Sequence, residues 1–169
     1  MRGIFNKISI EKMVRVRSAK PVDAELIYQF ICHKAEFDRS IGAYSSEIKT
    51  SVEKIQQTLF GDRSFAYVLF AEANKSAIGF ALYYFRYSSF AGQPSLWLED
   101  LFVNSDMRNH GAGTLLMNCL QQIAKDNNCS HLAWTADARN IKGLRFYKRL
   151  GAEIIERKGD RCLLKWEVS

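Results

Sequence analysis

The sequence lacks the patterns that mark several classes of protein. Its 169 residues hold only four cysteines, without a CxxC pair, and the three histidines show no HExxH spacing. No run approaches the roughly 18 apolar residues that a membrane span requires. The first residues, MRGIFNKISIEKM, have neither the apolar segment nor the cleavage site of a signal peptide. We therefore expect a cytoplasmic protein with reduced thiols and with no disulfide framework, bound metal or membrane anchor.

Positive charge is present, but it is concentrated at one end of the chain. The formal net charge is +6, and residues 1–20 hold six basic residues against one glutamate, whereas residues 21–62 are acidic. A basic chain raises nucleic acid as a partner. The N-terminal segment nevertheless lacks interleaved aromatic residues and any recognised motif, so we expect no nucleic-acid partner. Length predicts one domain, here residues 14–169, preceded by a basic extension, residues 1–13.

Hydrophobic periodicity predicts an α+β fold. Residues 14–18 alternate as a strand. A first helix then opens at Pro21 and Asp23, and a second, capped by Ser45 or Ser46, runs to about Phe60. FAYVLFAEA and IGFALYYFRY predict a hairpin of two strands, and LWLEDLFVN predicts a third strand after it.

The C-terminal half continues this mixture of elements. A helix of about sixteen residues, the strand HLAWTAD, a helix from about Asn140 to Leu150 and two final strands follow. The predicted order is βααβββαβαββ, with a mixed, mostly antiparallel sheet.

The stretch RNHGAG, residues 108–113, lies between a predicted strand and a predicted helix. Such a loop directs several backbone N–H groups toward one point, with the positive end of the helix dipole behind them. Gly111 and Gly113 would permit positive φ or a close approach to an anion, and Arg108 would add a charge-assisted contact. The glycines would equally suit a simple tight turn. No GxGxxG or GxxxxGK[ST] pattern is present, which disfavours a dinucleotide or a nucleoside triphosphate.

The residues around this loop carry a family resemblance. Residues 106–113, DMRNHGAG, resemble the R/Q-x-x-G-x-G/A signature of the GNAT superfamily of acetyl-CoA-dependent N-acetyltransferases. IGFALYYF, LEDLFV, and Asn140 followed by FYKRLGA resemble in particular its diamine branch, the spermidine/spermine and thialysine acetyltransferases. The resemblance covers roughly residues 14–167. It implies the GNAT fold, acetyl-CoA as cofactor, a small-molecule amine as substrate and a homodimer paired through strands near the C-terminus.

The resemblance also implies a set of cofactor-binding residues. In the family, the strand before the loop splays from the next strand, and its main chain binds the pantetheine arm of CoA. The positions implied for the cofactor are Leu101, Phe102, Val103, Arg108, Asn109, His110, Gly111, Ala112, Gly113, Thr114 and Asn140. An asparagine before a helix is equally suited to be an N-cap.

Two residues match the catalytic positions of the family. An amine is protonated at neutral pH, so a group must accept its proton before the lone pair attacks. Glu99 matches the family glutamate for this task, and strand alternation would place Asp100 on the opposite face. Tyr147 matches the tyrosine that protonates the leaving thiolate. A solvated strand end for Glu99 and a core position for Tyr147 are the alternatives.

The substrate residues are less sharply defined. The spacing of Glu36 and Asp38 is close to that of the acidic-aromatic stretch in the diamine branch but does not reproduce it. The alternative that both residues belong to a solvated helix end therefore stays open. Ala133, Trp134 and Thr135 align with the acceptor channel, although Trp134 also suits a buried strand. The basic net charge disfavours a highly charged polyamine and favours a smaller amine or an amino-acid side chain. A protein or peptide acceptor, and a non-catalytic CoA-binding module, remain alternatives.

Overall fold

The computed structural model describes residues 14–43 and 46–169. The predicted basic extension, residues 1–13, and Ser45 lie outside the described residues. Within the described part of the chain, no helix combines the length and apolar character needed to cross a membrane.

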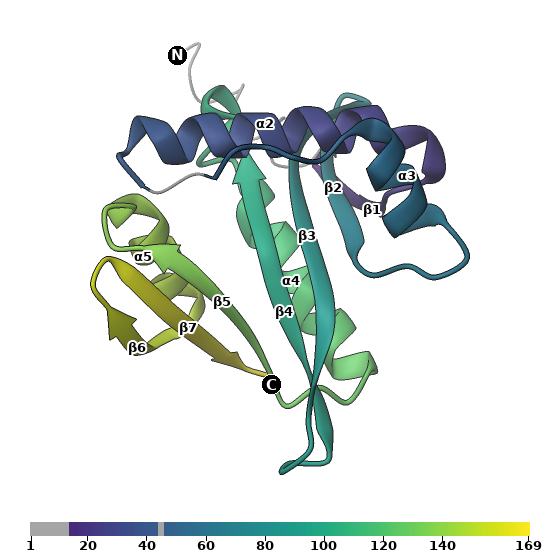
Figure 1. Ribbon diagram of the computed structural model, residues 1–169. Coiled ribbons are helices and arrows are strands. Elements are labelled where there is room, and N and C mark those ends of the chain that lie inside the picture. The colour runs from purple at the N-terminus through teal and green to yellow at the C-terminus, as the bar shows by residue number, and fades with distance from the viewer. Residues whose placement is uncertain (1–13, 44–45) are drawn as a thin grey trace.

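The elements follow the predicted order βααβββαβαββ, so the predicted α+β fold is confirmed (Figure 1). The strands and helices are β1 Arg15–Ser18, α2 Ala24–Ser40, α3 Val52–Phe60, β2 Tyr67–Ala73, β3 Ser76–Ser88, β4 Gln93–Val103, α4 Ala112–Asp126, β5 His131–Asp137, α5 Ile141–Leu150, β6 Glu153–Lys158 and β7 Arg161–Glu167. Two short 3₁₀ turns, η1 Pro21–Asp23 and η2 Ser105–Met107, precede α2 and α4.

Seven strands form one sheet in the order β1-β2-β3-β4-β5-β7-β6. Every neighbouring pair is antiparallel except β4 and β5, which are parallel. Their pairing is limited to Leu96 with Leu132 and Trp97 with Ala133. Beyond these residues the two strands diverge toward α2, as Figure 1 shows. The sheet is therefore split at its centre.

Each face of the sheet carries its own apolar core. The larger one lies under α4 and α5 and includes Leu116, Leu120 and Trp134. The smaller one lies under α2 and α3, where Phe30 stacks on Phe80 with ring centroids 5.2 Å apart. Burial on both faces fixes the positions of the strand ends on either side of the split.

Local signals set several element ends. Helix α5 is capped by Asn140, whose side chain accepts from Gly143 N at 3.0 Å, and it ends at Gly151 with φ 97°. The expected cap of α3 is wrong, because the helix begins later. Its N-cap is Ser51, whose side chain accepts from Lys54 N at 3.2 Å.

Candidate active site

The loop before α4 presents unpaired backbone donors. Gly111 is the N-cap of α4 with φ 84°, and no side chain caps the helix. The first backbone bond of the helix runs from Leu115 N to Gly111 O at 2.9 Å. The N–H groups of Ala112, Gly113 and Thr114 therefore have no acceptor within the helix. A Cβ built on Gly111 meets nothing within 4 Å, so the space beside this glycine is open.

Glycine is favoured at the two positions of the loop for different structural reasons. Gly111 adopts the left-handed conformation that side chains rarely take. A Cβ on Gly113 would lie 3.3 Å from Phe146 Cζ, so this glycine permits α5 to approach the start of α4. The turn-shaping and anion-binding interpretations of the loop are thus compatible.

Arg108 is directed into the protein rather than into the open loop. Its Nε donates to Val103 O at 2.9 Å, and its guanidinium lies 4.7 Å from the Phe37 ring centroid and 5.5 Å from that of Phe102. Burial lowers the pKa of this guanidinium. Arg108 therefore fixes the end of β4, and its contact with an anion stays a prediction. In the same loop, the buried Nδ1 of His110 has no hydrogen-bond partner among the described residues.

A β-bulge in β4 brings two carboxylates to one side of the strand. Leu98 pairs with Tyr83 and Asp100 pairs with Leu82, so Glu99 has no partner on β3. Leu98 and Leu101 both pack against the larger core, and the two residues between them point away from it. The expected alternation of Glu99 and Asp100 is wrong, because the bulge shifts the strand by one residue.

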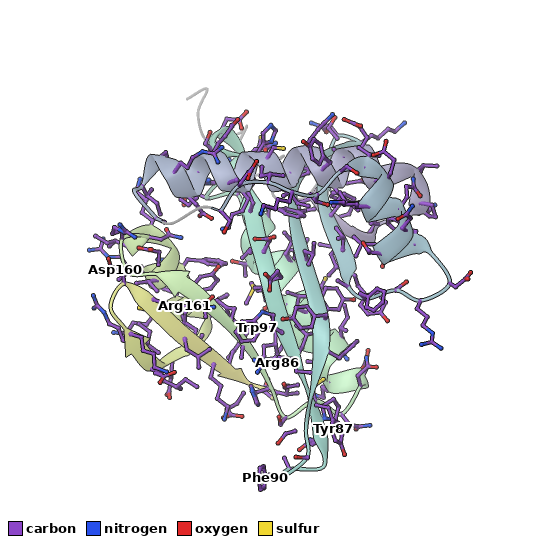
Figure 2. All side chains as sticks on the ribbon, in the orientation of Figure 1. Arg86, Tyr87, Phe90, Trp97, Asp160 and Arg161 are labelled. Atoms are coloured by element: carbon purple, nitrogen blue, oxygen red, sulfur yellow. The ribbon has the colours of Figure 1, made fainter. Side chains whose placement is uncertain are left out.

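Glu99 is held by a tryptophan. Trp97 Nε1 donates to Glu99 Oε2 at 2.9 Å, and the guanidinium of Arg86 lies 4.7 Å from the Trp97 ring centroid (Figure 2). Glu99 itself is exposed. The carboxylate is therefore oriented by a neutral donor and stays accessible from solvent.

Asp100 faces an open pocket of about 300 Å³ between β4, α2 and residues 46–50. The Lys34 ammonium of α2 forms an ion pair with Asp38 and lies 3.9 Å from Asp100 Oδ1. Burial raises the pKa of Asp100 to about 6, although the attraction of Lys34 opposes this rise. The ammonium of Lys34 thus interacts with both carboxylates, Asp38 and Asp100.

Tyr147 lies on α5, on the other side of the split. It is buried, with its ring centroid 4.9 Å from Trp134 and 5.2 Å from Phe146. Burial raises the pKa of its phenol, and the negative charges of Asp100 and Asp38 raise it further. The phenol is therefore protonated at neutral pH and lies within electrostatic range of both carboxylates.

The structure separates some of the predicted substrate residues. Helix α2 continues to Ser40, so Glu36 and Asp38 lie on different sides of a helix. Asp38 lines the pocket, whereas Glu36 is exposed. Trp134 packs in the larger core with Tyr147, and strand alternation turns Ala133 and Thr135 to the other face of β5. Trp134 belongs to the larger core, whereas Ala133 is buried outside that cluster and Thr135 is half-buried.

Sequence reasoning missed Lys34 and Asp100 as pocket residues, and Trp97 as the partner of Glu99. The Lys34–Asp38 spacing of four residues within a helix was an available signal. The other contacts depend on the bulge and on the approach of α2 to β4, which leave no local mark in the sequence.

The chain is similar to known acetyltransferases in sequence and in fold. A model described as "Acetyltransferase (GNAT) family" matches residues 29–152. The thialysine N-epsilon-acetyltransferase of Bos taurus is 30% identical over 158 residues, covering 88% of this chain and 90% of the relative. The human spermidine/spermine N(1)-acetyltransferase-like protein 1 is 28% identical, over 82% of this chain and 20% of that protein. The PaiA N-acetyltransferase of Thermoplasma acidophilum, solved with coenzyme A, superposes with a TM-score of 0.74 at 18% identity, covering 91% of this chain and 98% of that one.

Proposed function

The chain belongs to the GNAT family of acetyltransferases and is an acetyl-CoA-dependent N-acetyltransferase, and we propose that it acetylates a primary amine of a small molecule by direct transfer. The observation that carries this proposal is the split between β4 and β5, which has Glu99 on one side and Tyr147 on the other. The start of α4 follows the end of β4 and lies against Phe146 of α5, so its free N–H groups are near the same end of the split.

The residues present fit acetyl-CoA. The free N–H groups of Ala112, Gly113 and Thr114 suit its pyrophosphate. The edge of β4 that faces the split, at Leu101 and Phe102, has no strand partner on the β5 side and suits the amides of the pantetheine arm. When bound, acetyl-CoA supplies a thioester whose carbonyl carbon is the acetyl donor.

Glu99 is proposed to accept the proton of the substrate ammonium, directly or through water. The bulge turns Glu99 away from the core, and the Trp97 N–H fixes the position of its carboxylate. The carboxylate of Glu99 also attracts the protonated amine toward the split.

Tyr147 is proposed to donate a proton to the departing thiolate sulfur. Burial and the nearby carboxylates of Asp100 and Asp38 keep its hydroxyl protonated. A protonated donor suits this step, because a proton given to the sulfur neutralises the charge that develops as the thiolate departs.

The small-molecule acceptor is supported by two observations. The relatives named above are called thialysine and spermidine/spermine acetyltransferases. In addition, the pocket beside Glu99 is lined by the charged side chains of Lys34, Asp38 and Asp100, which suit a small charged ligand.

The proposal is tested by thiol release from acetyl-CoA with a panel of putrescine, spermidine, thialysine, lysine and a lysine peptide. We expect turnover of a small amine, reduced about 100-fold or more by Glu99→Gln and by Tyr147→Phe. Glu153→Gln and Tyr87→Phe are matched controls, because both side chains are exposed and Tyr87 lies at the far end of β3 (Figure 2).

Four outcomes would contradict this assignment. Activity unaffected by both catalytic variants would place the chemistry elsewhere. A large loss in Asp100→Asn, with none in Glu99→Gln, would move the proton acceptor to Asp100. Bound CoA without turnover of any amine would favour a binding module, and turnover of the peptide alone would favour a protein acceptor.

A further inference from the structure

We propose that Lys34 acts as an internal ammonium in the acceptor pocket, so that the pocket accepts an amine whose remote end carries a carboxylate and rejects one whose remote end is a second ammonium. The inference rests on the proposed function and concerns the same site. It makes the side-chain amine of a free amino acid the preferred acceptor class.

The geometry places Lys34 where a substrate cation would otherwise bind. Its ammonium is paired with Asp38, one helical turn along α2, and lies 3.9 Å from Asp100 Oδ1 on β4. The side chains of Lys34, Asp38 and Asp100 are 25%, 22% and 24% exposed, so all three are partly desolvated yet reach the pocket. Asp38 and Asp100 are therefore already in contact with a cation of the chain itself.

A second ammonium is disfavoured by this arrangement. A diamine would bring its remote cation to the same two carboxylates, and that cation would lie within a few ångströms of Lys34. Like charges repel strongly at such a distance where water is partly excluded. The attraction of Asp38 and Asp100 is thus offset for a diamine.

A carboxylate is favoured by the donors that Lys34 retains. An ammonium has three N–H donors, and Asp38 is the carboxylate at hydrogen-bonding distance, because 3.9 Å to Asp100 is an ion-pair distance only. Lys49 lines the same pocket. A substrate α-carboxylate can bind these two lysines, while its α-ammonium lies toward Asp100 and the exposed Glu47.

The pocket also lies beside the residues proposed to transfer protons, Glu99 and Tyr147. Asp100 is adjacent to Glu99 in the bulge of β4, and the charges of Asp100 and Asp38 act on Tyr147 across the split. An acceptor with its reactive amine at Glu99 therefore has its remote end directed toward Lys34.

Lysine and cadaverine provide the test, because they share the reactive amine and the carbon chain and differ by the α-carboxylate. For each we would measure kcat/KM by thiol release and, separately, the Kd by calorimetry on the full chain with CoA present. We expect wild type to favour lysine by about tenfold or more, and Lys34→Met to shift this ratio by about 100-fold toward cadaverine. Lys34→Arg should keep the preference for lysine, and Lys125→Met, an exposed lysine on α4, should change nothing.

The outcomes separate this inference from the proposed function. Equal use of both amines by wild type, or an unchanged ratio in Lys34→Met, would overturn the role of Lys34 while turnover itself upheld the acetyltransferase. Equal losses for both amines in Lys34→Met, not restored by Lys34→Arg, would assign Lys34 a structural role and also overturn it. Absence of turnover, together with a calorimetric preference for lysine that depends on Lys34, would support the pocket and contradict the proposed reaction. If neither turnover nor a preference that depends on Lys34 is found, the proposed reaction and the role of Lys34 are both overturned.

Discussion

Two of the clusters that combine carboxylates with cations in the described residues have opposite electrostatic properties. The first joins β1, β2 and η1, where Arg17 donates to Asp23 at 2.7 and 3.0 Å and to Glu72. Arg15 Nε donates to Glu72 at 3.0 Å. The second cluster is the pocket, where Lys34 serves both Asp38 and Asp100.

The difference lies in how completely each carboxylate is compensated. In the first cluster, the hydrogen bonds of Arg17 lower the pKa of Asp23 and of Glu72 against the effect of burial. In the pocket, burial outweighs Lys34 and raises the pKa of Asp100 to about 6. The carboxylates of the first cluster are therefore fully paired within the fold, whereas the only partly compensated Asp100 retains the capacity to bind a ligand.

The largest expected effect on stability comes from replacing Arg17, which bonds to both carboxylates of the first cluster. Arg17→Met should lower the free energy of unfolding by about 3 kcal/mol, because it leaves Asp23 and Glu72 largely buried without their main donor. Urea denaturation at pH 7 measures this loss, and kcat/KM per folded molecule should stay unchanged.

Arg15→Met is the matched control for that variant. Its side chain is 69% exposed, so its loss should cost less than about 1 kcal/mol. Equal effects of the two variants would show that Arg17 is not the centre of the cluster.

A smaller change removes one charge from the first cluster. Glu72→Gln should lower the free energy of unfolding by about 2 kcal/mol at pH 7, because two arginines lose their negative partner and one accepting oxygen becomes an amide NH2 that cannot accept. The folded pKa of Glu72 lies below its ordinary value of 4.5, so its contribution is present above that pH and is lost as pH falls through the folded pKa. Urea denaturation at pH 7, 5 and 3 should show wild type and variant converging toward the acid end. A constant difference between them would contradict the assigned cause.

The two clusters also differ in how far the sequence predicts them. Local patterns were sufficient for the element order, for the Asn140 cap and for the glycine at the start of α4, since each depends on neighbours within a few residues. The Arg17–Glu72 contact joins residues 55 positions apart, and strand pairing alone creates it. In the pocket, Asp38 was expected as a substrate residue, but its separation from Glu36 follows from the length of α2. The position of Asp100 beside Glu99 follows from a bulge. Long-range packing therefore decides which of the candidate carboxylates meet.

The smallest expected effect on the free energy of unfolding is a gain rather than a loss. It allows a direct comparison of the two clusters. Asp100→Asn makes the same acid-to-amide change as Glu72→Gln, yet it should raise the free energy of unfolding by about 1 kcal/mol at pH 8, after allowance for the quarter of the side chain that is exposed. The pKa of Asp100 is raised from 3.8 to about 6, so the folded state holds this proton more tightly than the unfolded state. The ionised carboxylate therefore costs stability as pH rises through that window, and the advantage of the amide should vanish near pH 4. Urea denaturation at pH 8 and pH 4 measures both. A loss of stability at pH 8 would mean that Lys34 compensates Asp100 as fully as Arg17 compensates Glu72, and the pocket would then be a structural ion cluster like the first.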